Sequence, residues 1–203
     1  MKCINLDKTA RLRIIRDEVF NLKKSPLYEY RKKNNYYPVL GEGSHNARIM
    51  FIGEAPGKNE AKTGRPFCGA AGKILDGLIE GIGLKRCDVY ITNIIKDRPP
   101  NNRDPFPNEI EIYSPFLSRQ IEAIQPRVIA ALGRYSMNHI MRQYDLDLEI
   151  LPISQAHGRI FETQVNFGIL TIVPLYHPAV ALYNRTRIDT LQKDFQMLKT
   201  FLK

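Results

Sequence analysis

The chain carries, from position 51, the stretch Phe51-Ile52-Gly53-Glu54-Ala55-Pro56-Gly57, which runs on to Gly64-Arg65-Pro66-Phe67. It includes the end of the apolar run 49–52, which predicts a buried strand. The glycines and prolines favour tight turns in which backbone N–H groups can approach a ligand closely. Glu54 stands at the carboxyl end of the strand, where open α/β sheets place their ligands. Phe67, an aromatic residue on a glycine-rich loop, is a candidate stacking surface for a flat ring.

The composition predicts one globular domain over residues 1–203. This length suffices for one well-buried core, and the 43% hydrophobic content is ordinary. No apolar run approaches the roughly 18 residues of a membrane span, and the N-terminus lacks a signal-peptide core, so we expect a soluble, cytoplasmic protein. Cys3, Cys68 and Cys87 are scattered, which indicates neither a disulfide framework nor a metal knuckle.

The formal net charge of +9 favours nucleic acid or another anionic surface as a partner, although simple solubility is an alternative reason for it. The basic, tyrosine-rich segment 28–37 also allows two interpretations. Its tyrosines either pack partly buried over the core, which we favour, or contact nucleic acid.

Apolar strands alternate with amphipathic helices along the chain. Asp7 is a candidate cap of the first helix, and Asn108 is a candidate cap of a later one. We expect strands near 48–53, 89–95 and 128–132, a β pair at 158–162 and 168–174, and helices near 70–82 and after residue 187. This alternation predicts a three-layer α/β/α fold around a central, mostly parallel sheet of four strands.

The loops that follow parallel strands meet at one edge of a sheet. The loops after residues 53, 95, 132 and 174 should therefore gather there, and they carry an unusual mixture of side chains. Together they supply a carboxylate, an aromatic ring, an amide, cations and an imidazole, from Glu54, Phe67, Asn93, Arg98, Arg103 and His177.

The same segments resemble the uracil-DNA glycosylase superfamily, and most closely its family-four branch. The matching motifs run through nearly the whole chain in order: Gly53-Glu54-Ala55-Pro56-Gly57, Gly64-Arg65-Pro66-Phe67, Thr92-Asn93-Ile94, the loop 96–103 and His177-Pro178-Ala179. The resemblance implies hydrolysis of the N-glycosidic bond between uracil and deoxyribose in DNA, after the nucleotide is rotated out of the helix.

It also implies roles for individual residues. His177 would donate to uracil O2, and Asn93 would read the base through its amide. Phe67 would stack on the ring, and Glu54 would position or activate water. The alternatives are a structural histidine, an asparagine that closes a turn, a core phenylalanine, and a glutamate that holds the loop. Backbone groups of Ala55 and Gly57 should line the pocket.

The resemblance assigns Lys96, Arg98 and Arg103 to DNA phosphates, with a solvated loop as the alternative. It places a minor-groove wedge at Leu182, Tyr183, Asn184 and Arg185. Leu182 could instead be the first core residue of the final helix. Glu60 is either a site residue or a surface charge, because its neighbour Ala61 replaces the aspartate usual in the family. We expect His139 to pack on a helix face, and His45 and His157 to be structural or at the surface.

The family-four branch usually holds an iron–sulfur cluster on four cysteines. The corresponding positions here are Leu22, Ser25, Asp97 and one within 112–114, and none is cysteine. Because such clusters need thiolate ligands, we expect no metal and no cofactor. Asp97 could form a salt bridge with Lys23 or Lys24 in place of the cluster.

The expected partner is uracil-containing DNA, single- or double-stranded. We expect the protein to bind it as a monomer and not to associate with a membrane. Other functions remain open: a protein that binds deaminated bases with weak or no hydrolysis, a glycosylase for another deaminated base, or a nucleotide-binding α/β protein. The loop 99–107 contains no histidine, which argues against covalent trapping of uracil.

Overall fold

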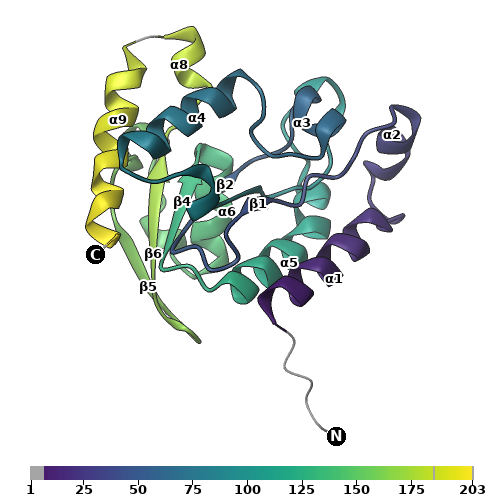
Figure 1. Ribbon diagram of the computed structural model, residues 1–203, viewed down its shortest axis with the longest axis horizontal. Coiled ribbons are helices and arrows are strands. Elements are labelled where there is room, and N and C mark those ends of the chain that lie inside the picture. Colours follow the sequence, from purple (N-terminus) through teal and green to yellow (C-terminus); the bar gives the residue numbers. More distant parts are fainter. Residues whose placement is uncertain (1–6, 185, 203) are drawn as a thin grey trace, which may run out of the picture.

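A sheet with the strand order β1-β3-β2-β4-β6-β5 passes through the middle of the molecule (Figure 1). The computed structural model describes residues 7–184 and 186–202. The strands are β1 (Glu42–Gly43), β2 (Ile49–Gly53), β3 (Tyr90–Asn93), β4 (Val128–Leu132), β5 (Phe161–Val165) and β6 (Gly168–Leu175).

Helices cover both faces of this sheet, which confirms the predicted three-layer α/β/α fold (Figure 1). On one face, α1, α5 and α6 pack against side chains such as Met50 and Ile52. On the other face, α4 and α9 pack around Phe51, whose ring stacks on Phe195 at 5.6 Å between centroids. The helices are α1 (Lys8–Phe20), α2 (Tyr28–Lys33), α3 (Lys58–Thr63), α4 (Ala70–Gly81), α5 (Pro107–Ile124), α6 (Arg134–Gln143), α7 (Ile153–Ala156), α8 (Val180–Tyr183) and α9 (Arg187–Met197).

The central strands β3, β2, β4 and β6 are parallel, as predicted. Every residue of β2 and β4 is buried, which explains why both read as continuous apolar runs without alternation. The sheet has six strands where we predicted four, because two antiparallel strands extend it at its edges: β5, the first strand of the predicted β pair, and β1, which we did not predict. The two residues of β1 are too short a segment to show any periodicity.

The helices differ from the prediction in two places, at the start of α5 and in the tyrosine-rich segment. Helix α5 begins at Pro107 and is capped by Phe106, not by Asn108, because the Glu109 carboxylate accepts the N–H of Phe106 (2.8 Å). The first part of the tyrosine-rich segment 28–37 forms the short helix α2 (Tyr28–Lys33), which we did not predict. The predicted cap of α1 is confirmed, since Asp7 Oδ1 accepts the N–H of Ala10 (2.6 Å).

The carboxyl ends of the central strands meet at one edge. Gly53 and Asn93 pair directly in the register of β2 and β3. The N–H of Gly133, just after β4, donates to the carbonyl of Leu175 at the end of β6 (2.8 Å). The loops that carry the predicted site residues therefore start side by side. Within the described residues, no helix has the length and apolar character needed to cross a membrane.

Candidate active site

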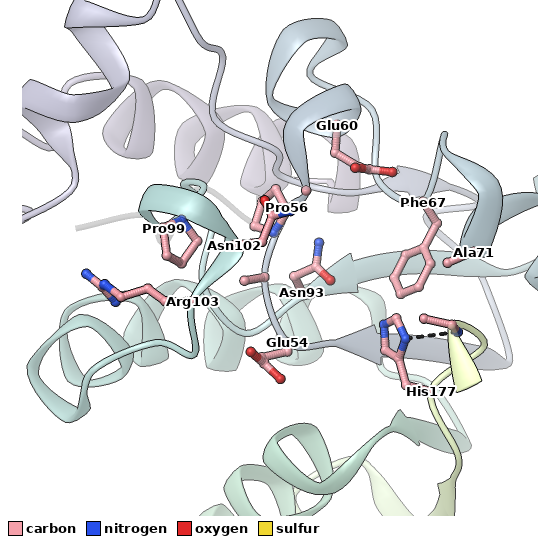
Figure 2. A pocket seen from close by; sticks show the side chains of 13 residues that line it. Glu54, Pro56, Glu60, Phe67, Ala71, Asn93, Pro99, Asn102, Arg103 and His177 are labelled. Atoms are coloured by element: carbon pink, nitrogen blue, oxygen red, sulfur yellow. Dashed lines mark hydrogen bonds between the residues drawn. The ribbon is translucent and has the colours of Figure 1, made fainter. Parts of the chain in front are cut away.

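A cavity of about 400 Å³ opens at this edge of the sheet (Figure 2). It is lined by segments that follow β2, β3 and β6. The lining residues are Glu54, Ala55, Pro56, Gly57, Glu60, Phe67, Ala71, Asn93, Pro99, Asn102, Arg103, His177 and Ala179. The residues predicted to bind and cleave are all among them, so the structure brings these distant segments together.

The absence of a side chain at Gly53 lets two of these residues approach each other. A Cβ atom at Gly53 would lie 2.4 Å from Asn93 Oδ1 and 2.7 Å from Phe67 Cζ, well inside van der Waals contact. Asn93 is only 2% exposed, and its side-chain amide makes no protein hydrogen bond within the described residues. Figure 2 shows this amide between Glu54 and Phe67. The amide is therefore free to bind a ligand.

Phe67 adopts a backbone conformation that non-glycine residues rarely take, with φ at +46°. Glu60 supports this turn, since its Oε1 accepts the N–H groups of Cys68 (2.9 Å) and Gly69 (3.0 Å). A Cβ at Gly72 would lie 1.8 Å from the Phe67 carbonyl oxygen, so the turn needs a glycine there. Glu60 is thus a brace of the stacking loop and a wall of the cavity, not a plain surface charge.

Arg86 is a second brace of the turn at Phe67, and no sequence motif predicted it. Its guanidinium donates to the carbonyl of Pro66, to Asp76 Oδ1 (2.6 Å) and to Glu42 Oε1 (3.4 Å). These partners come from segments far apart in the chain. No local pattern in the sequence could have indicated this contact.

His177 is a neutral donor aimed by its neighbour. Its Nδ1 accepts the N–H of Ala179 (3.2 Å), so the neutral ring carries its proton on Nε2. Burial lowers the pKa of His177 to about 4, an effect that Glu60 opposes, and the ring is therefore uncharged at neutral pH. The imidazole faces the Phe67 ring at 5.5 Å between centroids (Figure 2).

Glu54 is a half-buried carboxylate whose side chain has no hydrogen bond to any of the described residues. Burial and the charge of Asp104 raise the pKa of Glu54 to about 7, against the opposing effect of Arg134. A carboxylate with a pKa near neutrality can accept a proton from water as well as orient it.

Arg103 and Arg98 are held by partners near the cavity. Arg103 forms a bidentate pair with Glu109 (2.6 and 2.8 Å), and its guanidinium carbon lies 3.7 Å from the centre of the Phe106 ring. Arg98 donates to Asn102 Oδ1 (2.7 Å). Both side chains stay partly exposed, and their role toward phosphates stays a prediction.

The Arg98 guanidinium also donates to the hydroxyl groups of Tyr30 (3.1 Å) and Tyr36 (3.2 Å). The tyrosine-rich segment therefore lies against the loop that follows β3. This contact joins α2 to the rim of the cavity.

The prediction that Lys96 binds a phosphate is wrong. Its side chain is fully buried, and its ammonium group donates to Thr92, Asn93 and Gln120 inside the protein. A lysine that follows a strand gives no sign in the sequence of which way it points.

Leu182 and Tyr183 lie on the short helix α8, 47% and 90% exposed. Because α9 begins only at Arg187, the alternative that Leu182 is a core residue of the final helix is wrong. Asn184 Oδ1 accepts the N–H (3.0 Å) and hydroxyl (2.6 Å) of Thr186. Arg185 lies outside the described residues.

Asp97 pairs with Arg31, not with Lys23 or Lys24. Both carboxylate oxygens of Asp97 lie 3.2 Å from Arg31 Nη1, and the Tyr113 hydroxyl donates to Oδ2 (2.6 Å). Asp97 stands at a position where the family resemblance places a cluster cysteine, and Tyr113 lies within the range 112–114 where it places another. Without thiolates, these residues do not fit an iron–sulfur cluster. The described chain also holds no group of three or more His, Cys, Asp or Glu side chains suited to a metal.

The other histidines lie away from the cavity. His139 is partly buried on α6, as predicted, and burial lowers its pKa to about 4. His157 contacts Asp194 Oδ2 through Nδ1 (2.7 Å), and His45 contacts the Thr9 hydroxyl (2.8 Å). His139 Nε2 lies 3.4 Å from Ser114 Oγ, so all three histidines have structural partners.

Comparison with known proteins identifies relatives over most of the chain. The model of the "Uracil DNA glycosylase superfamily" matches residues 40–203. The Type-4 uracil-DNA glycosylase of Saccharolobus solfataricus is 45% identical over 192 residues, covering 94% of this chain and 86% of that protein. Those of Sulfurisphaera tokodaii and Archaeoglobus fulgidus are 44% identical, covering 91% of this chain and 82% of the relative, and 42% identical, covering 89% and 88%.

Two substitutions near Glu54 should shift its pKa in opposite directions. We expect its carboxyl group, followed by NMR, to titrate with a pKa of about 7. Asp104→Asn should lower this pKa by removing a negative charge, and Arg134→Gln should raise it by removing a positive one. Shifts of the same sign in both variants would contradict this account of the site.

The same shift affects stability. Because folding raises the pKa of Glu54, the contribution of this group to stability is fully present below its unfolded value and is lost as the pH rises toward 7. Glu54→Gln should therefore gain stability relative to the unsubstituted protein between about pH 5 and about pH 8, as measured by urea unfolding. If the difference in unfolding free energy between the two proteins does not change with pH over this range, the pKa of Glu54 is not raised.

Proposed function

The chain belongs to the uracil DNA glycosylase superfamily, and we propose that it hydrolyses the N-glycosidic bond of uracil in DNA and leaves an abasic site. One observation carries this proposal: a single cavity encloses an amide, a neutral imidazole, an aromatic ring and a carboxylate. These are the groups that uracil recognition and departure require. The reaction belongs to base excision repair of damaged DNA.

Recognition begins when the uracil nucleotide is rotated out of the DNA helix into the cavity, at a cost of a few kcal/mol. Phe67 stacks on the flipped ring, which is typically worth about 1–3 kcal/mol per base. Asn93 accepts from uracil N3–H and donates to O4. Cytosine reverses both roles, so the same amide would leave buried polar groups unpaired and reject it.

His177 stabilises the leaving group. As the glycosidic bond breaks, positive charge develops on the sugar and negative charge on uracil. The Nε2–H of His177 donates to uracil O2, and a donor oriented toward developing charge is worth about 3 kcal/mol. A neutral ring donates without delivering a proton, so uracil leaves as a stabilised anion.

Glu54 acts on water at the sugar. In its ionised form it orients water toward C1′ and accepts the proton, a role that contributes roughly 10²–10⁴-fold. Its pKa of about 7 means that excision should increase as the pH rises through neutrality. Backbone groups of Ala55 and Gly57 line the pocket beside it.

DNA lies over Arg98, Arg103 and the exposed end of α8. The two guanidinium groups contact phosphates, and Leu182 enters the gap left by the flipped base, flanked by Tyr183 and Asn184. The protein acts as a monomer on single- or double-stranded DNA and uses no cofactor. Among the described residues that line the cavity there is no lysine to act as a Schiff-base nucleophile, so the DNA strand itself is not cut.

The direct test is release of free uracil from an oligonucleotide that contains one uracil, without added metal. The purified protein should release it, more rapidly above about pH 7 than below, and His177→Ala should be roughly 10²–10³-fold slower. Full-length DNA after alkali treatment, with correctly folded protein, would reject the proposal. A protein–DNA adduct that survives denaturant would indicate capture in place of hydrolysis.

Asn93→Asp separates base reading from general DNA affinity. A carboxylate cannot donate to uracil O4, so excision should fall by about 10- to 100-fold, the effect of a hydrogen bond worth roughly 1.5–3 kcal/mol. Affinity for undamaged DNA of the same length should stay within a factor of about two, since phosphates dominate it. Equal losses in both measurements would show that Asn93 does not read the base.

A further inference from the structure

Lys96 is a fully buried cation directly beneath the candidate base reader. Its Nζ donates to the carbonyl oxygen of Asn93 (2.6 Å), to Thr92 Oγ1 (2.9 Å) and to Gln120 Oε1 (2.6 Å). No carboxylate of the described chain forms an ion pair with it. Burial disfavours the charged form and lowers the pKa of Lys96 well below its usual value, so the ammonium group depends on its three hydrogen-bond partners.

The hydrogen-bond pattern requires an ammonium group. The Thr92 hydroxyl donates to the carbonyl of Leu40 (2.5 Å), so it must accept from Lys96. Gln120 Nε2 donates to the same carbonyl (2.8 Å) and to the Tyr90 hydroxyl (3.2 Å), which turns Oε1 toward Lys96. The Asn93 carbonyl can only accept. Three acceptors need three N–H donors, and only the protonated amine has three.

This arrangement places Asn93 between two supports. The next residue, Ile94, donates its N–H to the carbonyl of Gly53 (2.9 Å), which holds the end of β3 against β2. Lys96 holds the Asn93 carbonyl from inside the protein. Because the Asn93 amide has no hydrogen bond of its own within the described residues, the backbone and the packing around Gly53 alone determine where it points.

We propose that Lys96 is a positioning residue for base recognition, which acts by fixing the backbone of Asn93 and never touches DNA. This inference rests on the proposed function of the cavity. Lys96 belongs to a basic loop and was predicted to contact phosphate at the surface. Under this inference it acts from inside the protein.

The test uses Lys96→Met, which retains the length of the side chain and removes all three donors. Uracil excision should fall about tenfold or more, while the slope of DNA affinity against salt stays unchanged. In an Asn93→Ala background, Lys96→Met should cause little further loss, because its effect passes through Asn93. Lys199→Met, at an exposed lysine near the end of the chain, is the matched control and should leave both quantities unchanged.

A salt slope that falls by about one in Lys96→Met would show a phosphate contact and overturn the proposal. The proposal would also be overturned if the fold losses of uracil excision in Lys96→Met and Asn93→Ala multiplied fully in the double variant. If Lys96→Met does not fold, Thr92→Val removes one acceptor of the ammonium, and the same coupling with Asn93→Ala is expected at a smaller size.

If the protein releases no uracil at all, the proposed function fails, and the inference is decided by NMR. The Asn93 side-chain amide should then shift in Thr92→Val but not in Lys199→Met.

A second inference concerns Arg31, Asp97, Tyr113 and Ser25, which form one buried network. The Tyr113 hydroxyl donates to Asp97 and is 2.8 Å from Ser25 Oγ, while Arg31 pairs with Asp97. Arg31 also donates to the carbonyls at the end of α1, including that of Phe20 (2.7 Å). All four side chains are at most 5% exposed.

Three of these residues stand at or within the positions where the family resemblance places cluster cysteines. The network joins the same parts of the chain that four such ligands would join: the segment after α1, the loop after β3, and α5. Asp97 is followed directly by Arg98 and Pro99, and Pro99 lines the cavity. We infer that this network takes the structural place of the cluster and fixes the base of the loop 99–107 over the cavity.

Native-state proteolysis distinguishes this brace from general stability. Asp97→Asn and the milder Tyr113→Phe should increase cleavage within the loop 99–107 by several-fold. Leu191→Ala, a cavity in the core on the opposite face of the sheet, serves as the control and should lower the melting temperature without that local effect. Equal cleavage in all three variants would overturn the inference. Stoichiometric iron and sulfide in the purified protein would also overturn it.

Discussion

Close approach of two strands at Gly53 is the constraint on which the site depends. The last residue of β2 has no side chain, so Asn93 from β3 and Phe67 from the next loop enter the space where a Cβ would lie. Any other residue at this position would separate the amide from the ring. One missing methyl group thus decides whether recognition and stacking can act on the same base.

The stacking ring is held in a conformation that its own backbone disfavours. A non-glycine residue in the left-handed region costs of order 1–3 kcal/mol. Three hydrogen bonds compensate for this cost at Phe67. The N–H groups of Cys68 and Gly69 donate to Glu60, and Arg86 donates to the carbonyl of Pro66. The ring is therefore positioned before a ligand arrives, which lowers the entropic cost of binding.

The three consecutive charges Lys96, Asp97 and Arg98 point in three directions, although they read as one solvated segment. Lys96 enters the core beneath Asn93, Asp97 enters the space between α1, α2 and α5, and Arg98 stays at the surface with two tyrosines. Buried charges survive only with good partners. These partners link the floor of the cavity, the loop at its rim and the tyrosine-rich segment into one supported unit.

The sequence by itself determined the parallel sheet and its two helical layers, because apolar runs and helical periodicity depend on local spacing. It also determined the edge where the site forms, since glycine and proline turns follow the strands that end at Gly53 and Asn93. Only the tertiary structure decided what Lys96, Asp97 and Glu60 do. The burial of a charge depends on partners such as Gln120, Tyr113 and the Cys68 amide, which are adjacent in space and unmarked in the sequence. The same reason explains the edge strand β1, which has two residues and forms through pairing with β3 and not through a pattern of its own.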